Sequence, residues 1–484
     1  MILGIDQGTT GSRAFIFDDK GKVVTSAYSE FEQFFPKPGW VEHDAAEIWD
    51  VTKKVCHEAL DDAGIDGSKL TAIGITNQRE TAVAWDRKTG EPLHRAIVWQ
   101  DRRTAGRCDR LKAEGVESMF RERTGLVLDA YFTGTKYEWM IKEGGVPEDA
   151  AFGTIDSWLL FKLTGRHATD YSNASRTLLF NIRELKWDPE LCDTLGVPID
   201  SLPEPVRNAE VLGETSEFGG SVPVAAMVGD QQGALYGQAC LEPGLSKNTY
   251  GTGNFLLANA GDGPPMLEQG LITTIAWGIG DRVDYALESS IFITGAGIQW
   301  LRDGLKIIEN ASDTEAMAAS LDSNEGVYFV PALTGLGSPH WDPYARGTIV
   351  GLTRGSSREH IARAALEAIA YQSVDAVRAQ NTALGVRLKE LRVDGGATAN
   401  AWLMQFQADM LGVPVVVPEI ADTTVLGAAY LAGVATDFWT EEDVKGLWTE
   451  SKRYEPTMSD DQRQSLLSDW RRALQRSGRW VIAE

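Results

Sequence analysis

Three aspartates of the sequence each end an apolar, strand-like run and are followed at once by small or amide residues. They are Asp6, Asp230 and Asp394. Because functional groups of α/β proteins gather at the carboxyl ends of strands, the three together point to a site. The carboxylate of Asp230 could be a general base or a metal ligand. An aspartate that caps the following helix has the same sequence pattern, so both interpretations stay open there.

Two turns rich in glycine and threonine have strand-like arms on both sides. The first spans residues 6–13 and the second residues 249–255. In the first turn, Gly8 and Gly11 permit dihedral angles that let backbone amides converge on an anion, and Arg13 adds a positive charge. Either turn alone could be an ordinary β-hairpin turn. Two of them, one in each half of the chain, indicate a nucleotide held between two lobes.

Two further segments place polar or small groups after an apolar run. Residues 394–400 contain paired glycines that allow close approach of a flat ring or a sugar, although a strand-to-helix turn looks the same. Arg79 and Glu80 place a cation beside an anion. On a strand they would point to opposite faces and would not simply pair with each other. In a loop both could hold one polyhydroxyl compound, but from this segment alone a solvated charged turn is favoured.

The elements that must position these residues follow from patterns of hydrophobic spacing. Strand-like runs alternate with helical ones, which predicts an α/β fold. The strongest helix covers residues 357–380, with Ser356 and Glu359 at the spacing of a capping box. A second helix at 401–411 ends at a glycine and is followed by a strand at 413–417.

The length of 484 residues suggests two large domains or about three ordinary ones. The turn-rich segment 241–246 predicts the boundary. It divides the chain into residues 1–240 and 241–484, the second with an extension from about residue 436.

Composition excludes several classes of protein. With 46 basic and 69 acidic residues the net charge is -23, which repels phosphodiester backbones, so we expect no nucleic-acid partner. No run approaches the roughly 20 apolar residues of a membrane span. The chain opens on a strand-like run rather than a leader, and its four cysteines form no CxxC pair, which fits a reducing cytoplasm. P-loop enzymes and protein kinases are excluded because their signature loops are missing.

Two motifs are specific enough to suggest a family. They are Pro-Lys-Pro-Gly-Trp at residues 36–40 and Asn-Gln-Arg-Glu-Thr at residues 77–81. With them the chain resembles the carbohydrate kinases of the actin/Hsp70/hexokinase superfold, and among these the glycerol kinases, over almost its whole length. The other matching segments, in unbroken order, are residues 6–10, 31–33, 98–104, 173–177, 229–232, 247–253, 341–347, 351–355 and 393–396.

The resemblance implies an α/β fold of two actin-like, ribonuclease H-like lobes with a nucleotide cleft between them. It implies phosphorylation of glycerol by ATP to sn-glycerol 3-phosphate with the help of Mg²⁺, in a homo-oligomer that is a dimer or tetramer. Asp230 would be the catalytic residue, accepting the proton of the attacking hydroxyl. The residues that would hold glycerol are Arg79, Glu80, Trp99, Tyr131, Asp230, Gln231 and Phe255. Those that would contact ATP are Thr9, Thr10, Gly11, Arg13, Thr252, Gly295, Gln299, Gly396 and Asn400. Asp6 would face Mg²⁺ with water in between.

The chain departs from its relatives at residues 213–223. This segment has neither the arginine that some bacterial relatives use for inhibition by a sugar bisphosphate nor the histidine that others phosphorylate, so we expect neither form of regulation. Asn254 stands where many relatives have cysteine, and we attach no function to it. A related kinase acting on a pentulose or tetritol, or a non-catalytic nucleotide-driven clamp, would share the fold. The presence of Asp230 with a full polyol-binding set favours a kinase over the clamp, and the Arg79 and Glu80 pair with Trp99 and Phe255 implies a pocket for the three carbons of glycerol.

Overall fold

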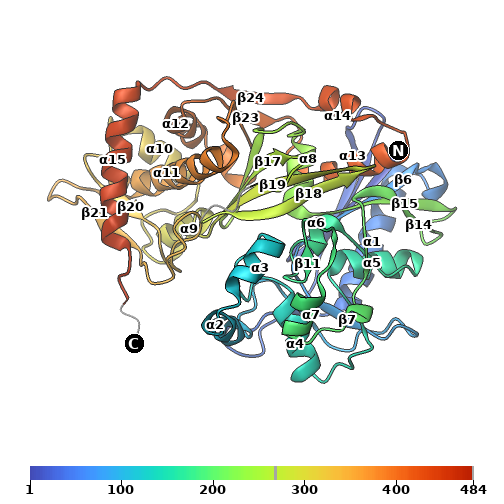
Figure 1. Cartoon of the computed structure of the whole chain (residues 1–484). Helices are drawn as coiled ribbons and strands as arrows, with labels where there is room; N and C mark the ends of the chain where they lie inside the picture. The colour runs from blue at the N-terminus through green and yellow to red at the C-terminus, as the bar shows by residue number, and fades with distance from the viewer. Residues whose placement is uncertain (266–269, 482–484) are drawn as a thin grey trace.

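A computed structural model describes residues 1–265 and 270–481 of the chain (Figure 1). Its centre is a 13-stranded mixed sheet in the order β24-β23-β22-β16-β17-β19-β18-β14-β15-β6-β1-β2-β3. The strands of this sheet are β1 Ile2–Gln7, β2 Gly11–Phe17, β3 Val23–Glu30, β6 Ala72–Asn77, β14 Ala209–Thr215, β15 Val222–Gly229, β16 Ser246–Tyr250, β17 Asn254–Gly261, β18 Ile272–Ile279, β19 Arg282–Ile291, β22 Leu391–Asp394, β23 Val415–Pro418 and β24 Glu450–Tyr454. The α/β class predicted from the sequence is confirmed.

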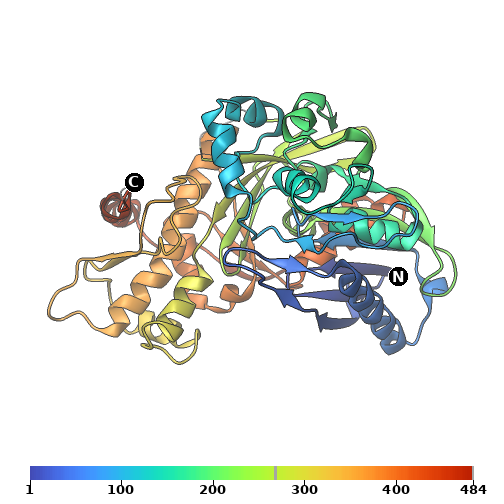
Figure 2. The same cartoon turned by 90° about the horizontal axis from the view of Figure 1, so that it is seen from below.

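Helices cover the sheet and extend from both ends of it. Figure 1 shows α10, α11, α12 and α15 at one end of the molecule and α1 and α5 at the other, and Figure 2 shows the same separation from below. The helices are α1 Ala45–Ala63, α2 Ala105–Ala113, α3 Glu117–Thr124, α4 Gly134–Lys142, α5 Ile155–Thr164, α6 Tyr171–Ala174, α7 Pro189–Leu195, α8 Asp230–Gly237, α9 Gly295–Asp303, α10 Asp313–Ala319, α11 Arg358–Leu384, α12 Ala401–Leu411, α13 Thr423–Ala435, α14 Glu441–Leu447 and α15 Asp460–Ser477.

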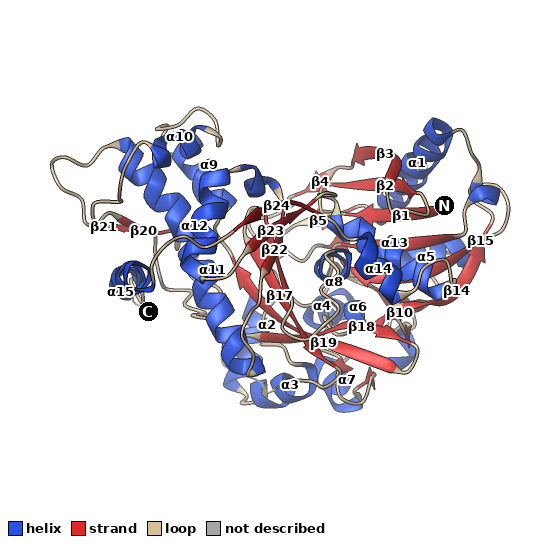
Figure 3. Cartoon of the chain, turned by 90° about the horizontal axis from the view of Figure 1, so that it is seen from above, coloured by secondary structure: helices blue, strands red, loops and turns tan. Residues whose placement is uncertain are grey.

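Short strands form five smaller sheets among the described residues, and Figure 3 shows one of them, β20 (Tyr328–Val330) with β21 (Thr348–Val350), at one end of the molecule. They are β4 Gln33–Phe34, β5 Glu42–His43 and β8 Ala96–Ile97; β7 Val83–Trp85 and β9 Ala151–Gly153; β10 Ala168–Asp170 and β13 Glu204–Val206; β11 Phe180–Asn181 and β12 Lys186–Trp187; and β20 Tyr328–Val330 and β21 Thr348–Val350. Among the described residues no helix is both long and apolar enough to cross a membrane.

Strand register brings the predicted chemical groups to one edge of the sheet. β6 runs parallel to both β1 and β15, with Asp6 opposite Thr76 and Gly229 opposite Asn77. The residues that follow the three strands therefore emerge side by side. In the other half, β16 runs parallel to β22, with Thr249 opposite Asp394, which places the turn after β16 beside the segment after β22.

The two halves of the large sheet meet along a short junction. β14 pairs antiparallel with β15, but it pairs with β18 through one parallel register pair, Ala209 with Ile279. Asn208 strengthens this junction, because its amide donates to the Gly278 carbonyl at 3.0 Å and its side-chain oxygen accepts from the Gly278 amide at 2.8 Å. α13 also connects the halves, since it packs back onto β1 and β6.

The predicted helices form with small differences at their ends. α11 confirms the helix expected at 357–380, but its N-cap is Ser357 and not Ser356, so the predicted capping box is wrong by one residue. Ser357 has extended backbone dihedrals, and its amide donates to Nδ1 of His360 at 3.1 Å, while Ser356 accepts from the Thr353 amide in the preceding turn. α12 begins and ends as predicted, and the strand expected at 413–417 is β23, which starts two residues later.

Candidate active site

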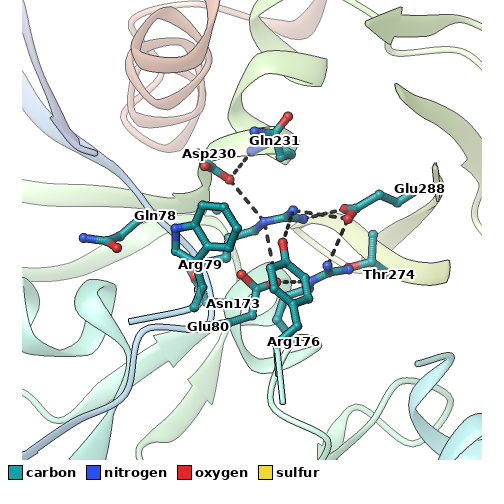
Figure 4. Close-up of polar contacts among 12 residues, drawn as sticks. Gln78, Arg79, Glu80, Asn173, Arg176, Asp230, Gln231, Thr274 and Glu288 are labelled. Atoms are coloured by element: carbon teal, nitrogen blue, oxygen red, sulfur yellow. Dashed lines mark hydrogen bonds and ion pairs between the residues drawn. The ribbon is translucent and has the colours of Figure 1, made fainter. Parts of the chain in front are cut away.

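Asp230 lies at the sheet edge with its side chain partly open to solvent. It is the first residue of α8, directly after β15, and its side chain is 32% exposed. Its carboxylate oxygen lies 3.1 Å from Nε of Arg79 and accepts the amide of Gln231 at 2.7 Å (Figure 4). The residue before it, Gly229, is the N-cap of α8, so Asp230 is not the N-cap residue, although its carboxylate accepts an amide of the first turn. Asp230 is also an accessible carboxylate beside a cation.

Arg79 and Glu80 are both buried, which contradicts the interpretation of their segment as a solvated turn. Arg79 donates from Nη1 to Oε2 of Glu288 at 2.6 Å and from Nη2 to Oε1 at 3.3 Å. Glu80 accepts from Nε of Arg176 at 2.6 Å. Both residues follow the end of β6 and lie in a loop, so the strand alternative does not apply to them. Arg79 Nε and Glu80 Oε1 are 3.9 Å apart, and each residue is paired more closely with another charge than with its neighbour.

The backbone at Glu80 is held in an uncommon conformation. Its φ of 61° lies in the left-handed region, where residues other than glycine are infrequent. The Glu80 carbonyl accepts from Oγ1 of Thr133 and from Nζ of Lys136, both at 3.2 Å. Lys136 also donates to the carbonyl of Tyr131 at 2.5 Å. This buried lysine therefore fixes the two loops that carry Glu80 and Tyr131.

The electrostatics of the buried charges follow from desolvation and pairing. Burial opposes ionisation of Glu288, but the charges of Arg176 and Arg79 outweigh it and lower the pKa of Glu288 to about 2. Burial likewise opposes the charge on Arg79, yet Glu288 and Glu80 raise the Arg79 pKa well above its ordinary value. For Glu80, burial exceeds the attraction of Arg79 and Arg176, and its pKa is raised.

More accessible side chains surround this buried group. Trp99 donates from its indole nitrogen to Oγ1 of Thr9 at 2.9 Å and packs edge-on against the Tyr131 ring at 5.7 Å. Tyr131 Oη accepts from Arg79 Nη2 at 3.4 Å. Next to Asp230, Gln231 accepts a hydrogen bond from Nζ of Lys247. Phe255, on β17, is the register partner of Thr249 on β16. Contacts connect six of the residues predicted to hold the substrate, while Phe255 is related to them only through its strand partner Thr249, which Lys247 contacts.

The first glycine and threonine turn is the hairpin between β1 and β2. It closes with the Gly8 amide donating to the Gly11 carbonyl at 3.0 Å. Arg13 points to Asp422, 3.1 Å away, and both side chains are exposed. Burial, together with Asp230 and Asp422, raises the pKa of Asp6 to about 7 against the opposing charge of Arg13. The turn thus presents amides, an accessible arginine and a carboxylate with a high affinity for positive charge.

A cavity of about 460 Å³ opens on the other half of the molecule. Its wall includes Thr252, Gly295, Gln299, Gly396 and Asn400, which are the five residues predicted to contact the nucleotide from the second half. They come from the β16–β17 turn, from α9 and from the segment between β22 and α12. The structure therefore brings together residues that are up to about 150 positions apart in the sequence.

Sequence reasoning did not assign roles to several residues of both regions. The cavity is also lined by Ile298, Ser312, Leu366 and Ile369, none of which was predicted. Arg176 lay in a matching segment but received no role. Glu288 carried a usable signal, because it is the one charged residue of the otherwise uncharged run 285–291. A charge in a buried strand requires a partner.

Lys247 is a further unpredicted group. It is fully buried on β16 and donates to Gln231 and, at 2.8 Å, to Oγ1 of Thr249. Burial lowers its pKa to about 8, although Asp394 and Asp230 act in the opposite direction. Lys247 thus links the substrate side to the strand that leads to the cavity.

Comparisons with known proteins show which family the chain belongs to. The model of the FGGY family of carbohydrate kinases, N-terminal domain, matches residues 1–237, and that of the C-terminal domain matches residues 246–436. Glycerol kinase 2 of Thermotoga maritima is 53% identical and glycerol kinase of Caldanaerobacter subterraneus subsp. tengcongensis 54% identical, each match covering 99% of both chains.

Solved structures give the same result. The crystal structure of Plasmodium falciparum glycerol kinase with ADP superposes with a TM-score of 0.93 at 36% identity, covering 100% of this chain and 98% of the other. This similarity confirms the predicted two-lobed, actin-like fold. The chain belongs to the FGGY family of carbohydrate kinases, and within that family it is similar to the glycerol kinases over its full length.

Proposed function

We propose that the chain transfers the γ-phosphoryl group of ATP to glycerol, giving sn-glycerol 3-phosphate and ADP. The observation that carries this proposal is the accessible carboxylate of Asp230 beside the buried Arg79 and Glu80. A small polyol needs both donors and acceptors, and these two side chains supply them from fixed positions. The relatives with more than half of their residues identical are named glycerol kinases.

In this proposal Asp230 is the general base. One hydroxyl of glycerol attacks the γ-phosphorus, the bond from that phosphorus to the β,γ-bridging oxygen breaks, and the hydroxyl proton passes to Asp230. Arg79 and Glu80 orient the other hydroxyls, with Tyr131 and Gln231, while Trp99 and Phe255 pack against the carbon atoms. Phosphoryl transfer depends mainly on such positioning and on neutralising charge.

The nucleotide would lie between the cavity and the β1–β2 turn. Its purine would enter the cavity among Thr252, Gly295, Gln299, Gly396 and Asn400. Its phosphates would meet the Gly8–Gly11 turn, with the hydroxyls of Thr9 and Thr10 and the guanidinium of Arg13. Since Arg13 now pairs with Asp422, phosphate would replace that carboxylate.

The residues present fit an Mg²⁺ ion that is bound largely by water and phosphate. Among the described residues, no group of three or more histidine, cysteine, aspartate or glutamate side chains forms a metal site. Burial raises the pKa of Asp6 to about 7 despite the charge of Arg13, so a bound cation would stabilise its ionised form. Mg²⁺ typically takes one or two carboxylates and keeps several waters, and it would neutralise charge on the transferring phosphoryl group.

The arrangement of domains and subunits belongs to the same proposal. We infer that residues 1–240 and 241–484 act as the two lobes, with an extension from about residue 436, and that they close over the substrates to exclude water. A cytoplasmic homo-oligomer remains the expectation from the resemblance.

The decisive test measures ATP consumption by the purified protein across a panel of polyols and ketoses, with Asp230→Asn as the control. Glycerol should give the highest kcat/KM, and the product should be the 3-phosphate. A pentulose or tetritol phosphorylated more efficiently than glycerol would replace the substrate assignment. Nucleotide binding without phosphoryl transfer to any member of the panel would favour the non-catalytic clamp.

A further inference from the structure

The charges beneath the proposed substrate site form a closed ring. Its four members are Arg79, Glu288, Arg176 and Glu80, and each lies next to a residue of opposite sign (Figure 4). Arg176 closes the ring, because it donates from Nε to Glu80 at 2.6 Å and from Nη2 to Oε1 of Glu288 at 3.0 Å. Two positive and two negative charges balance, which is the arrangement that makes buried ions tolerable.

The ring itself is buried, and the accessible group beside it is Asp230. Arg176 and Glu288 have side chains that are 0% exposed, whereas Asp230, which is attached to the ring through Arg79, is 32% exposed. Arg79 and Glu80 are 2% exposed, and Arg79 is the ring member that pairs with Asp230. In the proposed function the ligand contacts Arg79 and Glu80 and neither Arg176 nor Glu288. Any effect of Arg176 or Glu288 on the substrate must therefore pass through Arg79 and Glu80.

Glu288 controls where the guanidinium of Arg79 lies. It accepts both terminal nitrogens in a bidentate pair, which fixes the plane of the group. The remaining partners of Arg79 include Asp230 at 3.1 Å and Oε1 of Gln232 at 3.2 Å. Without the charge of Glu288, Asp230 is the nearest carboxylate left, so the guanidinium would turn toward the proposed base and away from the ligand.

Arg176 plays the equivalent part for Glu80. Its guanidinium carbon lies 5.2 Å from the Phe132 ring centre and 5.7 Å from that of Tyr131, so aromatic rings limit its movement. From this position its Nε reaches the Glu80 carboxylate and its Nη2 reaches Glu288. A lysine cannot make both contacts with the geometry of a planar guanidinium.

The ring also joins the two halves of the chain. Arg79, Glu80 and Arg176 belong to the first half, while Glu288 is on β19 in the second. Tyr285, also on β19, donates from its hydroxyl to the Ile182 carbonyl at 2.6 Å and packs within the first half, which holds the strand in place.

We propose that Glu288 and Arg176 are positioning residues that set the glycerol affinity of the enzyme by holding Arg79 and Glu80, although neither touches the substrate. This inference rests on the proposed function. It adds Glu288 and Arg176 to the residues that determine glycerol binding. It also makes β19, a strand of the second half, part of the support of the glycerol site.

The test compares Glu288→Gln with Glu367→Gln in the full chain. Glu367 is a matched control, since it is also buried and ion-paired, with Arg363 at 2.8 Å, but lies on α11 outside the ring. Both substitutions keep the shape and remove one buried charge. We expect both to lower the unfolding temperature. Glu288→Gln alone should raise the glycerol KM about tenfold or more while leaving the ATP KM within about twofold.

Arg176→Lys provides a second variant that keeps the total charge of the ring. It should also raise the glycerol KM, because one ammonium cannot replace both contacts, and it tests the inference if Glu288→Gln does not fold. A glycerol KM in Arg176→Lys, or in folded Glu288→Gln, equal to that of Glu367→Gln would overturn the inference and leave a purely structural role. Wild-type protein without glycerol-dependent ATP consumption would instead overturn the proposed function.

Discussion

The substrate region and the nucleotide cavity solve recognition in different ways. The first is built on five charged side chains around Arg79 and Glu80, four of them buried. The second is a cavity of about 460 Å³ whose predicted contacts are glycines, a threonine and two amides. Fixed charges can distinguish hydroxyl groups, because an unmatched buried charge is costly. The predicted contacts of the cavity carry no charge, and apolar side chains such as Leu366 and Ile369 line it as well, so shape should contribute more to recognition there. Substitutions should therefore separate the two regions by which substrate they affect.

The largest effect on activity should come from Asp230→Asn. The amide has nearly the same shape but cannot take the proton, so kcat should fall by about 10² to 10⁴. Binding of glycerol and of ADP should persist, and calorimetry or ligand-induced thermal shifts would measure it. Near-normal turnover would show that the base is elsewhere or is not needed.

Arg79→Ala should weaken recognition of glycerol without changing the nucleotide cavity. It removes the donor and leaves Glu288 and Asp230 without their shared cation. Loss of a hydrogen bond to a charged group costs about 1.5–3 kcal/mol, so kcat/KM for glycerol should fall about tenfold or more. ADP affinity should change little, and an equal loss for both ligands would mean that the two regions are not independent.

Gly295→Ala should produce the opposite pattern. A Cβ at this position would lie 2.5 Å from the Gly251 carbonyl oxygen, which forces the β16–β17 turn to move. ADP affinity should fall by roughly tenfold, equivalent to about 1.4 kcal/mol, with the glycerol KM nearly unchanged.

Gly396→Ala is the matched control, because no protein atom lies within 4 Å of its Cβ. This variant should keep its fold, and a loss of ADP affinity in it would report direct contact with the ligand. If Gly295→Ala binds ADP like the wild type, the turn has no part in the nucleotide site.

The smallest effect concerns pH and stability on the substrate side. His43 pairs through Nε2 with Gln33 at 2.9 Å and through Nδ1 with Gln78, next to Arg79, at 3.5 Å, and burial lowers its pKa to about 4. In the unfolded chain the ordinary pKa is about 6.5. As the pH falls, the unfolded state therefore takes up the proton before the folded state does. The contribution of neutral His43 to the free energy of unfolding should be fully present above about pH 6.5 and be lost as the pH falls toward about 4.

His43→Gln should reduce the slope of unfolding free energy against pH in that window by up to about 1.4 kcal/mol per pH unit. Chemical denaturation at several pH values would measure the slope. An unchanged slope would assign the acid sensitivity to another group, for which His167 is the next candidate, since burial also lowers its pKa to about 4.

The sequence allowed the fold class to be predicted, together with the neighbourhood of most candidate site residues, for reasons that differ by residue. Strand ends are visible in sequence because an apolar run stops at a polar residue, as at Asp6 and Asp230. The cavity contacts, by contrast, were carried over from the family resemblance, since nothing local distinguishes Gly295 from other glycines. The capping box of α11 was misplaced by one residue because Ser356 and Ser357 are adjacent serines and only backbone geometry separates them.

The ring of charges could not be predicted from sequence. Arg79, Arg176 and Glu288 are separated by about 100 positions each, and their pairing depends on β19 lying against the first half. Even the local prediction for Arg79 and Glu80 was reversed by this packing. The sequence around Arg79 and Glu80, taken alone, predicted exposed charges. In the structure, ion pairs with Glu288 and Arg176 stabilise the two residues in a buried position.

The short junction between β14 and β18 has a mechanical consequence. β1 and β6 share six register pairs, but β14 and β18 share one, so the large sheet is two stiff plates joined along a narrow seam. A pulling force applied at its outer edges, β3 and β24, would load this seam before it loaded the longer ladders. α13 follows β23 of one plate and packs against α8, β6, β1 and β14 of the other, so it adds contacts across the seam. A force–extension trace should therefore begin with rupture at the seam, followed by unravelling of each plate.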